Sequence, residues 1–225
     1  MIGVGITTRN RNDILDRHLQ THFRGRVPGP LVIVDDASET PYNGATYRFD
    51  QNVGIATGKN KCIELLYDLG VTEFFLFDDD SYPIVDDWYV PYVESREPHL
   101  MASYQPSRRP FARVIYQDSE LKAMSRPQGW MLYANRVCID RVGGMDAANF
   151  GKWGGEHTHW SNRIFNAGLT TFRFADVPNG SSLVSGLDFQ GGVERLPKDF
   201  RVSEWAKSGG RELWDIDSDG FVAWK

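Results

Sequence analysis

The chain has 225 residues, 41% of them hydrophobic and 24% charged, which is the composition of a folded globular protein. Its formal net charge of -5 argues against a protein that binds nucleic acid through a general basic surface. The two cysteines, Cys62 and Cys138, lie in apolar patterns and are predicted to be reduced core thiols. No apolar run approaches the roughly 20 residues that cross a bilayer, and the start lacks the pattern of a secretory signal. We therefore predict a cytoplasmic protein without membrane insertion.

The first eighty residues predict strands that alternate with helices. Continuous apolar runs at 2–8, 31–34 and 74–77 have the length and the β-branched or aromatic content of buried strands. Between them, apolar residues recur at helical spacing in 12–23 and again in the segment that ends before Gly70. This order predicts an α/β fold with a mainly parallel sheet that helices cover on both faces.

Polar residues follow each of the three predicted strands. Thr8 and Arg9 follow the first, Asp35 and Asp36 follow the second, and three aspartates at 78–80 follow the third. Parallel strands end at one edge of a sheet, and ligands of such sheets bind beyond that edge. The sequence therefore predicts a binding site there.

Three adjacent carboxylates repel one another and lose hydration in a cleft, so a positive partner is expected beside residues 78–80. Asp78 and Asp80 are two residues apart, which in an extended segment places their side chains on one face. Carboxylate oxygens suit Mg²⁺ or Mn²⁺ bridged to phosphate oxygens. We predict such a cation, with a diphosphate, at Asp80 and Asp78.

Four segments in order, "GVGITTRNR", "VIVDDAS", "NVGIATGKN" and "FDDDS", resemble GT-A-fold glycosyltransferases and are closest to glycosyltransferase family two. The resemblance implies a Rossmann-like, mixed and mainly parallel sheet, a UDP-sugar donor, and Asp80 as metal ligand in the DxD motif. The donor-nucleotide contacts that it implies are Thr8, Arg9, Asp35, Asp36, Asn52, Lys59 and Asp78.

The segment 143–169, "GGMDAANFGKWGGEHTHWSNRIFNAGL", resembles the acceptor-side segment of β-1,4-galactosyltransferases and polypeptide N-acetylgalactosaminyltransferases. The resemblance implies that Trp153, Gly155 and Glu156 contact the sugars and that Glu156 and His157 are catalytic. Inverting relatives place an Asp after the Glu and retaining relatives place an Asn, where this chain has His157, so both stereochemical outcomes stay open. A helix N-terminus favours carboxylate and neutral imidazole, so we expect His157 to be the base of an inverting enzyme.

Two further metal predictions come from the end of the chain. The relatives supply a late metal-binding histidine, but no histidine follows His159 here, and Asp188 is a candidate substitute. The stretch "DIDSDG" at 215–220 fits the first part of a calcium loop, without an acidic twelfth residue, and fits an Asp-Gly turn as well.

The predicted architecture is one GT-A domain over 1–190, with a nucleotide-binding half at 1–105 and an acceptor-side half at 106–190. Residues 191–225 are expected to be an extension packed on the same domain. The predicted function is transfer of a hexose or N-acetylhexosamine from a UDP-sugar to a glycan, a protein or a modified nucleic acid.

Two other functions stay open at this point. One is a UDP-sugar-binding protein of the same fold with little or no catalysis. The other is a sugar-nucleotide nucleotidyltransferase, which would need a Gly-rich basic loop where this chain has "TTRNRND". The sequence gives no oligomeric state.

Overall fold

The computed structural model describes residues 1–103, 113–150, 152–186 and 220–224. Its central sheet has six strands in the order β3-β2-β1-β4-β9-β6. Their bounds are β1 (Ile2–Thr8), β2 (Leu31–Asp35), β3 (Tyr47–Arg48), β4 (Glu73–Asp78), β6 (His99–Met101) and β9 (Met131–Asn135). Strands β1 to β4 run parallel, and β9 is antiparallel to both of its neighbours. The predicted fold class, a mixed and mainly parallel sheet, is confirmed.

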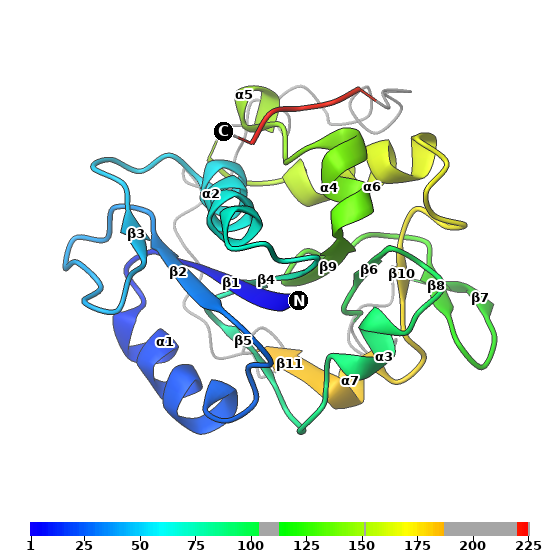
Figure 1. Cartoon of the computed structure of the whole chain (residues 1–225), viewed down its shortest axis with the longest axis horizontal. Coiled ribbons are helices and arrows are strands. Elements are labelled where there is room, and N and C mark those ends of the chain that lie inside the picture. Colours follow the sequence, from blue (N-terminus) through cyan, green and yellow to red (C-terminus); the bar gives the residue numbers. More distant parts are fainter. Residues whose placement is uncertain (104–112, 151, 187–219, 225) are drawn as a thin grey trace.

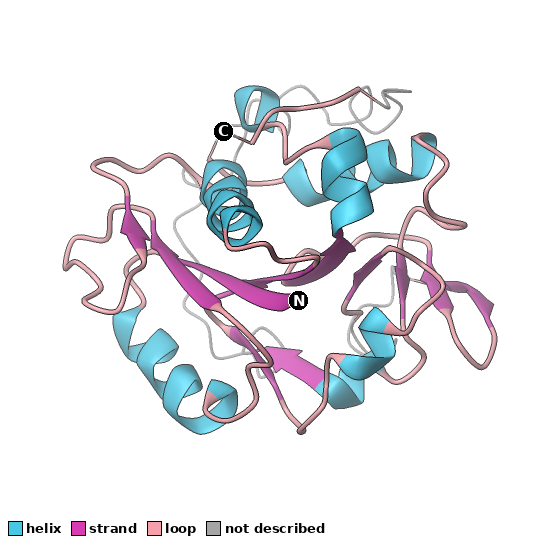
Figure 2. Ribbon diagram, in the orientation of Figure 1, coloured by secondary structure: helices cyan, strands magenta, loops and turns pink. Residues whose placement is uncertain are grey.

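Helices cover both faces of this sheet (Figure 1). On one face lie α2 (Ile55–Asp68), α4 (Arg136–Val142), α5 (Ala147–Phe150) and α6 (Glu156–Asn166). On the other lies α1 (Asn12–His18), which the π-helical turn η1 (Leu19–Phe23) continues. Figure 2 shows the same layers, with short elements beside the main sheet. These are β5 (Ser81–Pro83), α3 (Val90–Val93), β7 (Val114–Gln117), β8 (Lys122–Met124), β10 (Ala175–Asp176), α7 (Gly180–Leu183) and β11 (Val184–Gly186).

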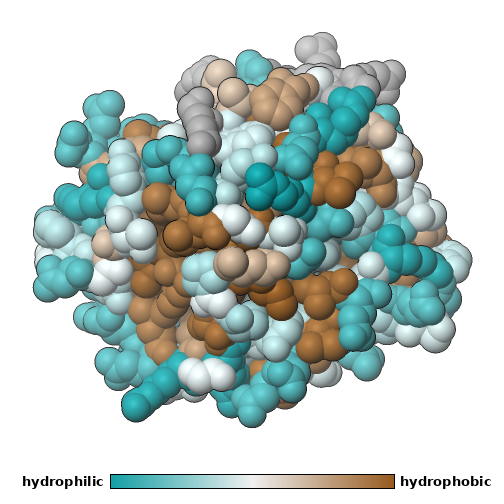
Figure 3. Space-filling model, viewed as in Figure 1, coloured by the Kyte–Doolittle hydropathy of each residue, from teal (hydrophilic) through white to brown (hydrophobic). Residues whose placement is uncertain are grey.

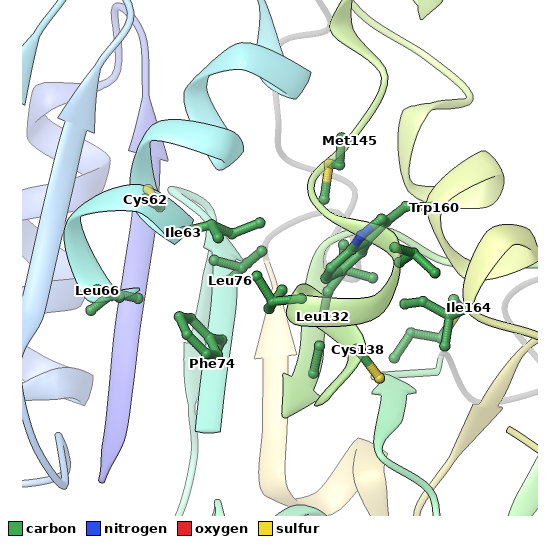
Figure 4. Packing of buried hydrophobic residues seen from close by; sticks show 14 of the residues in the cluster. Cys62, Ile63, Leu66, Phe74, Leu76, Leu132, Cys138, Met145, Trp160 and Ile164 are labelled. Atoms are coloured by element: carbon green, nitrogen blue, oxygen red, sulfur yellow. The ribbon is translucent and has the colours of Figure 1, made fainter. Parts of the chain in front are cut away.

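Strand β4 shows why the sequence contains continuous apolar runs. Phe74 and Leu76 belong to the core on the α2 side, and Phe75 and Phe77 belong to the core on the α1 side. Successive side chains of a strand point to opposite faces, so a strand buried on both faces needs apolar residues at every position. Figure 4 shows the first core, where Trp160 of α6 packs beside residues of α2, β4 and β9.

Arg163 of α6 has a fully buried side chain that binds the backbone of neighbouring segments. Its guanidinium donates to the carbonyl oxygens of Val142, Gly144 and Gly220. Burial lowers the pKa of Arg163 to about 10, and nearby Asp146 offsets part of that effect. Residues 220–224 therefore lie against α6 and the loop after α4, where Val222 also forms a parallel bridge with Gly143.

We predict that Arg163→Met lowers the free energy of unfolding by about 2–4 kcal/mol, because buried carbonyls lose their donors. Urea unfolding of the full chain measures the change. Arg173→Met is the matched control: Arg173 is exposed and contacts Asn162 at 3.4 Å, so its loss is expected to cost under about 1 kcal/mol. Equal stability of the two variants would contradict the assigned role.

The face of the molecule on which Figure 1 marks the N-terminus carries apolar surface near its middle (Figure 3). Exposed apolar residues at the start of β1 and the end of α2 include Met1 and Leu69. A seven-residue strand such as β1 is about 23 Å long, so this surface is well separated from the carboxyl ends of the strands. Among the described residues, no helix is long and apolar enough to cross a membrane.

Candidate functional site

The ends of β1, β2 and β4 lie side by side, and we call this part of the sheet the carboxyl edge. Thr8 pairs in register with Asp35, and Thr7 pairs with Asp78. Strand pairing alone therefore brings together the polar residues that follow three separate strands, as the sequence predicts.

The carboxylate triplet, residues 78–80, is neutralised in part by two cations of the chain. Lys59 Nζ lies 2.8 Å from Asp78 Oδ1, an ion pair whose angles do not form a hydrogen bond. Arg11 Nη1 donates to Asp79 Oδ1 at 3.0 Å and to Asp80 Oδ2 at 2.9 Å. The positive partner expected beside the aspartates is thus supplied first by α2 and by the residue before α1.

Burial and charge act in opposite directions on these groups. Burial raises the pKa of Asp79, while Arg11 and the hydroxyl of Thr8, which donates to Asp79 Oδ2 at 2.8 Å, lower it; the net direction is upward. Burial lowers the pKa of Arg11, but the carboxylates of Asp79 and Asp80 outweigh it and the net direction is upward. The Arg11 guanidinium is therefore held in its charged form.

Asp35 and Asp36 both bind backbone of their own chain. Asp35 is fully buried and accepts from the N–H groups of Ser38 and Tyr42 and from Arg48. Burial raises its pKa and these donors lower it, with a net downward shift. The role of Asp35 in the structure is to shape the loop after β2.

Asp36 holds the segment before α2 against the carboxyl edge. It accepts from the N–H groups of Val53 at 2.6 Å and Gly54 at 2.9 Å. Asn52 directly precedes this contact and is partly buried. Arg9 directly follows β1 and is also partly buried. Arg9, Asp36 and Asn52 thus lie at or next to the carboxyl edge.

Glu156 and His157 begin α6, and they contact each other. Gly155 precedes the helix with φ 90°, in the left-handed region that glycine adopts without strain. Glu156 Oε2 accepts from the N–H of Gly154 at 2.9 Å, and Oε1 lies 3.0 Å from His157 Nδ1. Burial raises the pKa of Glu156, but His157 and the backbone donors lower it below its ordinary value. An ionised Glu156 can only accept, so His157 Nδ1 carries a proton, and in the neutral ring Nε2 is the acceptor.

Gly129 and Trp130 connect this pair with the carboxylate triplet. A Cβ added to Gly129 would lie 2.7 Å from the His157 ring, so the ring packs directly on this backbone. The next residue, Trp130, accepts through its carbonyl from the Asp78 N–H at 2.9 Å and from the Ser81 hydroxyl at 2.8 Å. One dipeptide before β9 therefore touches both groups of candidate residues.

Trp153 is 52% exposed, in the glycine-rich segment before α6. The same segment is attached to α2, the helix that carries Lys59: the N–H of Ile55 donates to Lys152 O at 3.0 Å. The amide of Asn60 also bonds both the N–H and the carbonyl of Met145, at 2.7 and 2.8 Å. The predicted donor and acceptor segments are thus in contact.

The residues present fit a divalent cation that is shared with phosphate. Across the described ranges, no group of three or more His, Cys, Asp or Glu side chains could hold a metal by itself. Asp78 and Asp80 offer only oxygen, and Mg²⁺ and Mn²⁺ sites commonly combine one or two carboxylates with phosphates and water. Gly186 pairs with Ser81, next to Asp80, but Asp188 and the calcium candidate at 215–219 lie outside the described residues.

Sequence reasoning missed Arg11, Asp79 and Gly129 as parts of the site. The spacing of Asp78 and Asp80 predicts an extended segment with both side chains on one face, but β4 ends at Asp78 and residues 79–80 form a turn. Asp80 therefore shares Arg11 with Asp79, while Asp78 pairs with Lys59. Arg11 stands in the quoted "TTRNR", but only the fold shows that it reaches across to β4. Gly129 could not be identified from the sequence, because it matters only through the absence of a side chain where the His157 ring packs.

Comparisons with known proteins place the fold. No family model matches the sequence, and no curated protein matches it. The mannosyltransferase PcManGT from Pyrobaculum calidifontis, solved with GDP-Man and Mn²⁺, is similar at TM-score 0.54 and 15% identity over 76% of this chain and 53% of its own. GalNAc-T7, solved with UDP, GalNAc and Mn²⁺, gives TM-score 0.57 and 15% identity over 87% of this chain and 43% of its own. This chain therefore spans about half the length of these two proteins.

A putative glucose-1-phosphate thymidylyltransferase from Bacillus anthracis is also similar, with TM-score 0.50 and 12% identity over 89% of this chain and 99% of its own. Sequence identities this low show a shared fold and do not show a shared reaction. The predicted resemblance to GT-A glycosyltransferases is confirmed at that level. The chain has a GT-A glycosyltransferase fold resembling that of GalNAc-T7.

Proposed function

We propose that the protein is a glycosyltransferase that moves a sugar, a hexose or an N-acetylhexosamine, from a UDP-sugar to an acceptor hydroxyl. The observation that carries this proposal is the contact of Gly129 with the His157 ring, next to the Trp130 carbonyl that binds the Asp78 N–H. A candidate base and a candidate diphosphate site thereby adjoin the same dipeptide. Inverting glycosyl transfer needs a base close to the diphosphate site, because the acceptor hydroxyl attacks the carbon that the diphosphate leaves.

On the donor side, Asp78 is proposed to bind the ribose, because its side chain is 34% exposed at the end of β4. Lys59 and Arg9 supply positive charge for the diphosphate. Thr8 and Asn52 lie at the same edge. Asp36, rather than the fully buried Asp35, is proposed to contact the uracil of the donor. Asp80, with Asp78, would hold Mn²⁺ or Mg²⁺ together with the phosphates. A bound divalent cation offsets the charge that develops on the departing diphosphate.

On the acceptor side, His157 Nε2 takes the proton of the attacking hydroxyl. The hydroxyl oxygen forms the new bond to the anomeric carbon, the bond to the diphosphate oxygen breaks, and the nucleoside diphosphate leaves with the electron pair. Glu156 fixes the tautomer of His157 and stabilises the imidazolium that forms, so this pair does the work of the single carboxylate base expected from relatives. Trp153 and Gly155 border the space for the sugars. Attack from the face opposite the diphosphate inverts the anomeric configuration.

The first test is release of nucleoside diphosphate from a panel of UDP- and GDP-sugars with Mn²⁺, alongside calorimetric binding of UDP and GDP. We expect slow hydrolysis of one UDP-sugar and loss of that hydrolysis with EDTA, because water can replace the acceptor. Binding of UDP without turnover of any donor, with or without an acceptor panel, would favour a sugar-nucleotide-binding protein. Failure of both nucleotides to bind, with and without Mn²⁺, would remove the donor-site proposal.

A further inference from the structure

Arg11 has an unusual place in the carboxylate triplet. A single nitrogen, Nη1, donates to two carboxylates, those of Asp79 and Asp80. Its backbone is fixed, since the Arg11 carbonyl accepts from the N–H of Leu15 at the start of α1. The backbone of the triplet is fixed on the same helix, through His18 Nδ1 and the Asp79 carbonyl at 3.1 Å. Helix α1 therefore holds the guanidinium and the aspartates together as one unit.

The two carboxylates that Arg11 contacts have different surroundings. Asp79 is buried and also accepts from the Thr8 hydroxyl, so it keeps that hydrogen bond if the guanidinium moves. Asp80 is the carboxylate that the donor-site proposal assigns to the divalent cation, and its Oδ2 oxygen is in contact with Arg11. Since the Arg11 side chain remains 24% exposed, it has room to turn outward from the carboxyl edge.

We propose that Arg11 is an exchangeable internal cation. Without a donor it pairs with both Asp79 and Asp80; when a donor and a divalent cation bind, it releases Asp80 and binds the diphosphate instead. This inference rests on the proposed function and adds a role for a residue outside the expected motif. Two cations cannot share the Asp80 carboxylate without repulsion, so Arg11 weakens binding of the metal alone. Because the diphosphate then attracts the released guanidinium, metal and nucleotide bind cooperatively, each strengthening the other by the same factor.

The test is Mn²⁺ binding to the nucleotide-free protein, measured by calorimetry and by electron paramagnetic resonance of the Mn²⁺ that stays free. Arg11→Gln is expected to tighten Mn²⁺ binding by about threefold to tenfold, the range for one partly exposed ion pair. Arg17→Gln, which removes one exposed arginine from the same helix, is the matched control and should change the affinity by less than about twofold. Addition of UDP should tighten Mn²⁺ binding strongly in the native protein and much less in Arg11→Gln.

Arg11→Lys keeps the positive charge and is expected to bind Mn²⁺ like the native protein. If the glutamine variant does not fold, the tightening of Mn²⁺ binding by UDP in the native protein is the remaining test, and its absence overturns the exchange. Unchanged or weaker Mn²⁺ binding in Arg11→Gln, with UDP still bound, overturns the exchange but leaves the proposed function standing. Tightening in Arg11→Lys equal to that in Arg11→Gln overturns it too, because the effect would not follow the charge. Absence of UDP binding in every variant overturns the donor-site proposal itself.

Discussion

Replacement of His157 by alanine is expected to lower kcat for sugar transfer by about 10²- to 10⁴-fold, the usual contribution of a positioned general base. The reason is local. Glu156 binds Nδ1 of His157 at 3.0 Å and leaves Nε2 as the proton acceptor. UDP affinity should stay within about twofold, because the ring lies against Gly129 and not against the cations of the donor side. Steady-state transfer assays and calorimetry on the same preparations separate the two effects.

Two companion variants test how the ring is held. Gly129→Ala places a Cβ 2.7 Å from the His157 ring, so it should displace the ring and lower kcat while UDP still binds. Glu156→Gln keeps the size of the side chain but removes the charge that stabilises the imidazolium, and should lower kcat by less than the loss of the ring. Transfer by His157→Ala within a few-fold of the native rate would show that another group accepts the proton.

The parallel part of the fold is predictable from the sequence because residues 31–34 of β2 and 74–77 of β4 are all apolar, as burial on both faces requires. The order of the sheet beyond β4 is not. Strand β9 inserts antiparallel beside β4, and its apolar sequence is equally compatible with a parallel strand. Its direction depends on tertiary packing. Leu132 and Ala134 of β9 share a core with Trp160 of α6, and Asn135 at the end of β9 caps α4.

The site is predictable where a residue's own position along a strand or helix decides its place. Asp78 reaches the carboxyl edge because it ends β4, Asp80 because it lies in the turn that directly follows, and Glu156 begins α6 because Gly155 precedes it. Partners from distant parts of the chain are not predictable in this way. The pairing of Lys59 with Asp78, and the packing of His157 on Gly129, arise only when separate elements close on one another.

Asp80→Asn is expected to lower donor hydrolysis and sugar transfer by about 10²- to 10³-fold, the scale for loss of one charged group that stabilises a leaving group. Asparagine keeps the shape and an oxygen, but a neutral amide binds Mn²⁺ far more weakly than a carboxylate does. Titration of the rate with Mn²⁺ measures the loss, and partial recovery at high Mn²⁺ would assign it to the metal. The same substitution removes one partner of Arg11, yet Asp79 keeps the guanidinium at 3.0 Å. Stability should therefore fall by under about 1 kcal/mol.

Asp86→Asn is the matched control, because Asp86 follows the next strand, β5, and its side chain is 83% exposed and pairs with Arg26 at the surface. It should leave transfer unchanged. If Asp80→Asn turned over at the native rate, Asp80 would be a structural partner of Arg11 alone. Arg11 and Lys59 would then offset the charge of the triplet in part, and the diphosphate would have to be bound by the chain's own cations without help from a metal. The Mn²⁺ titration and the two asparagine variants together show whether a metal or the chain's own cations bind the diphosphate.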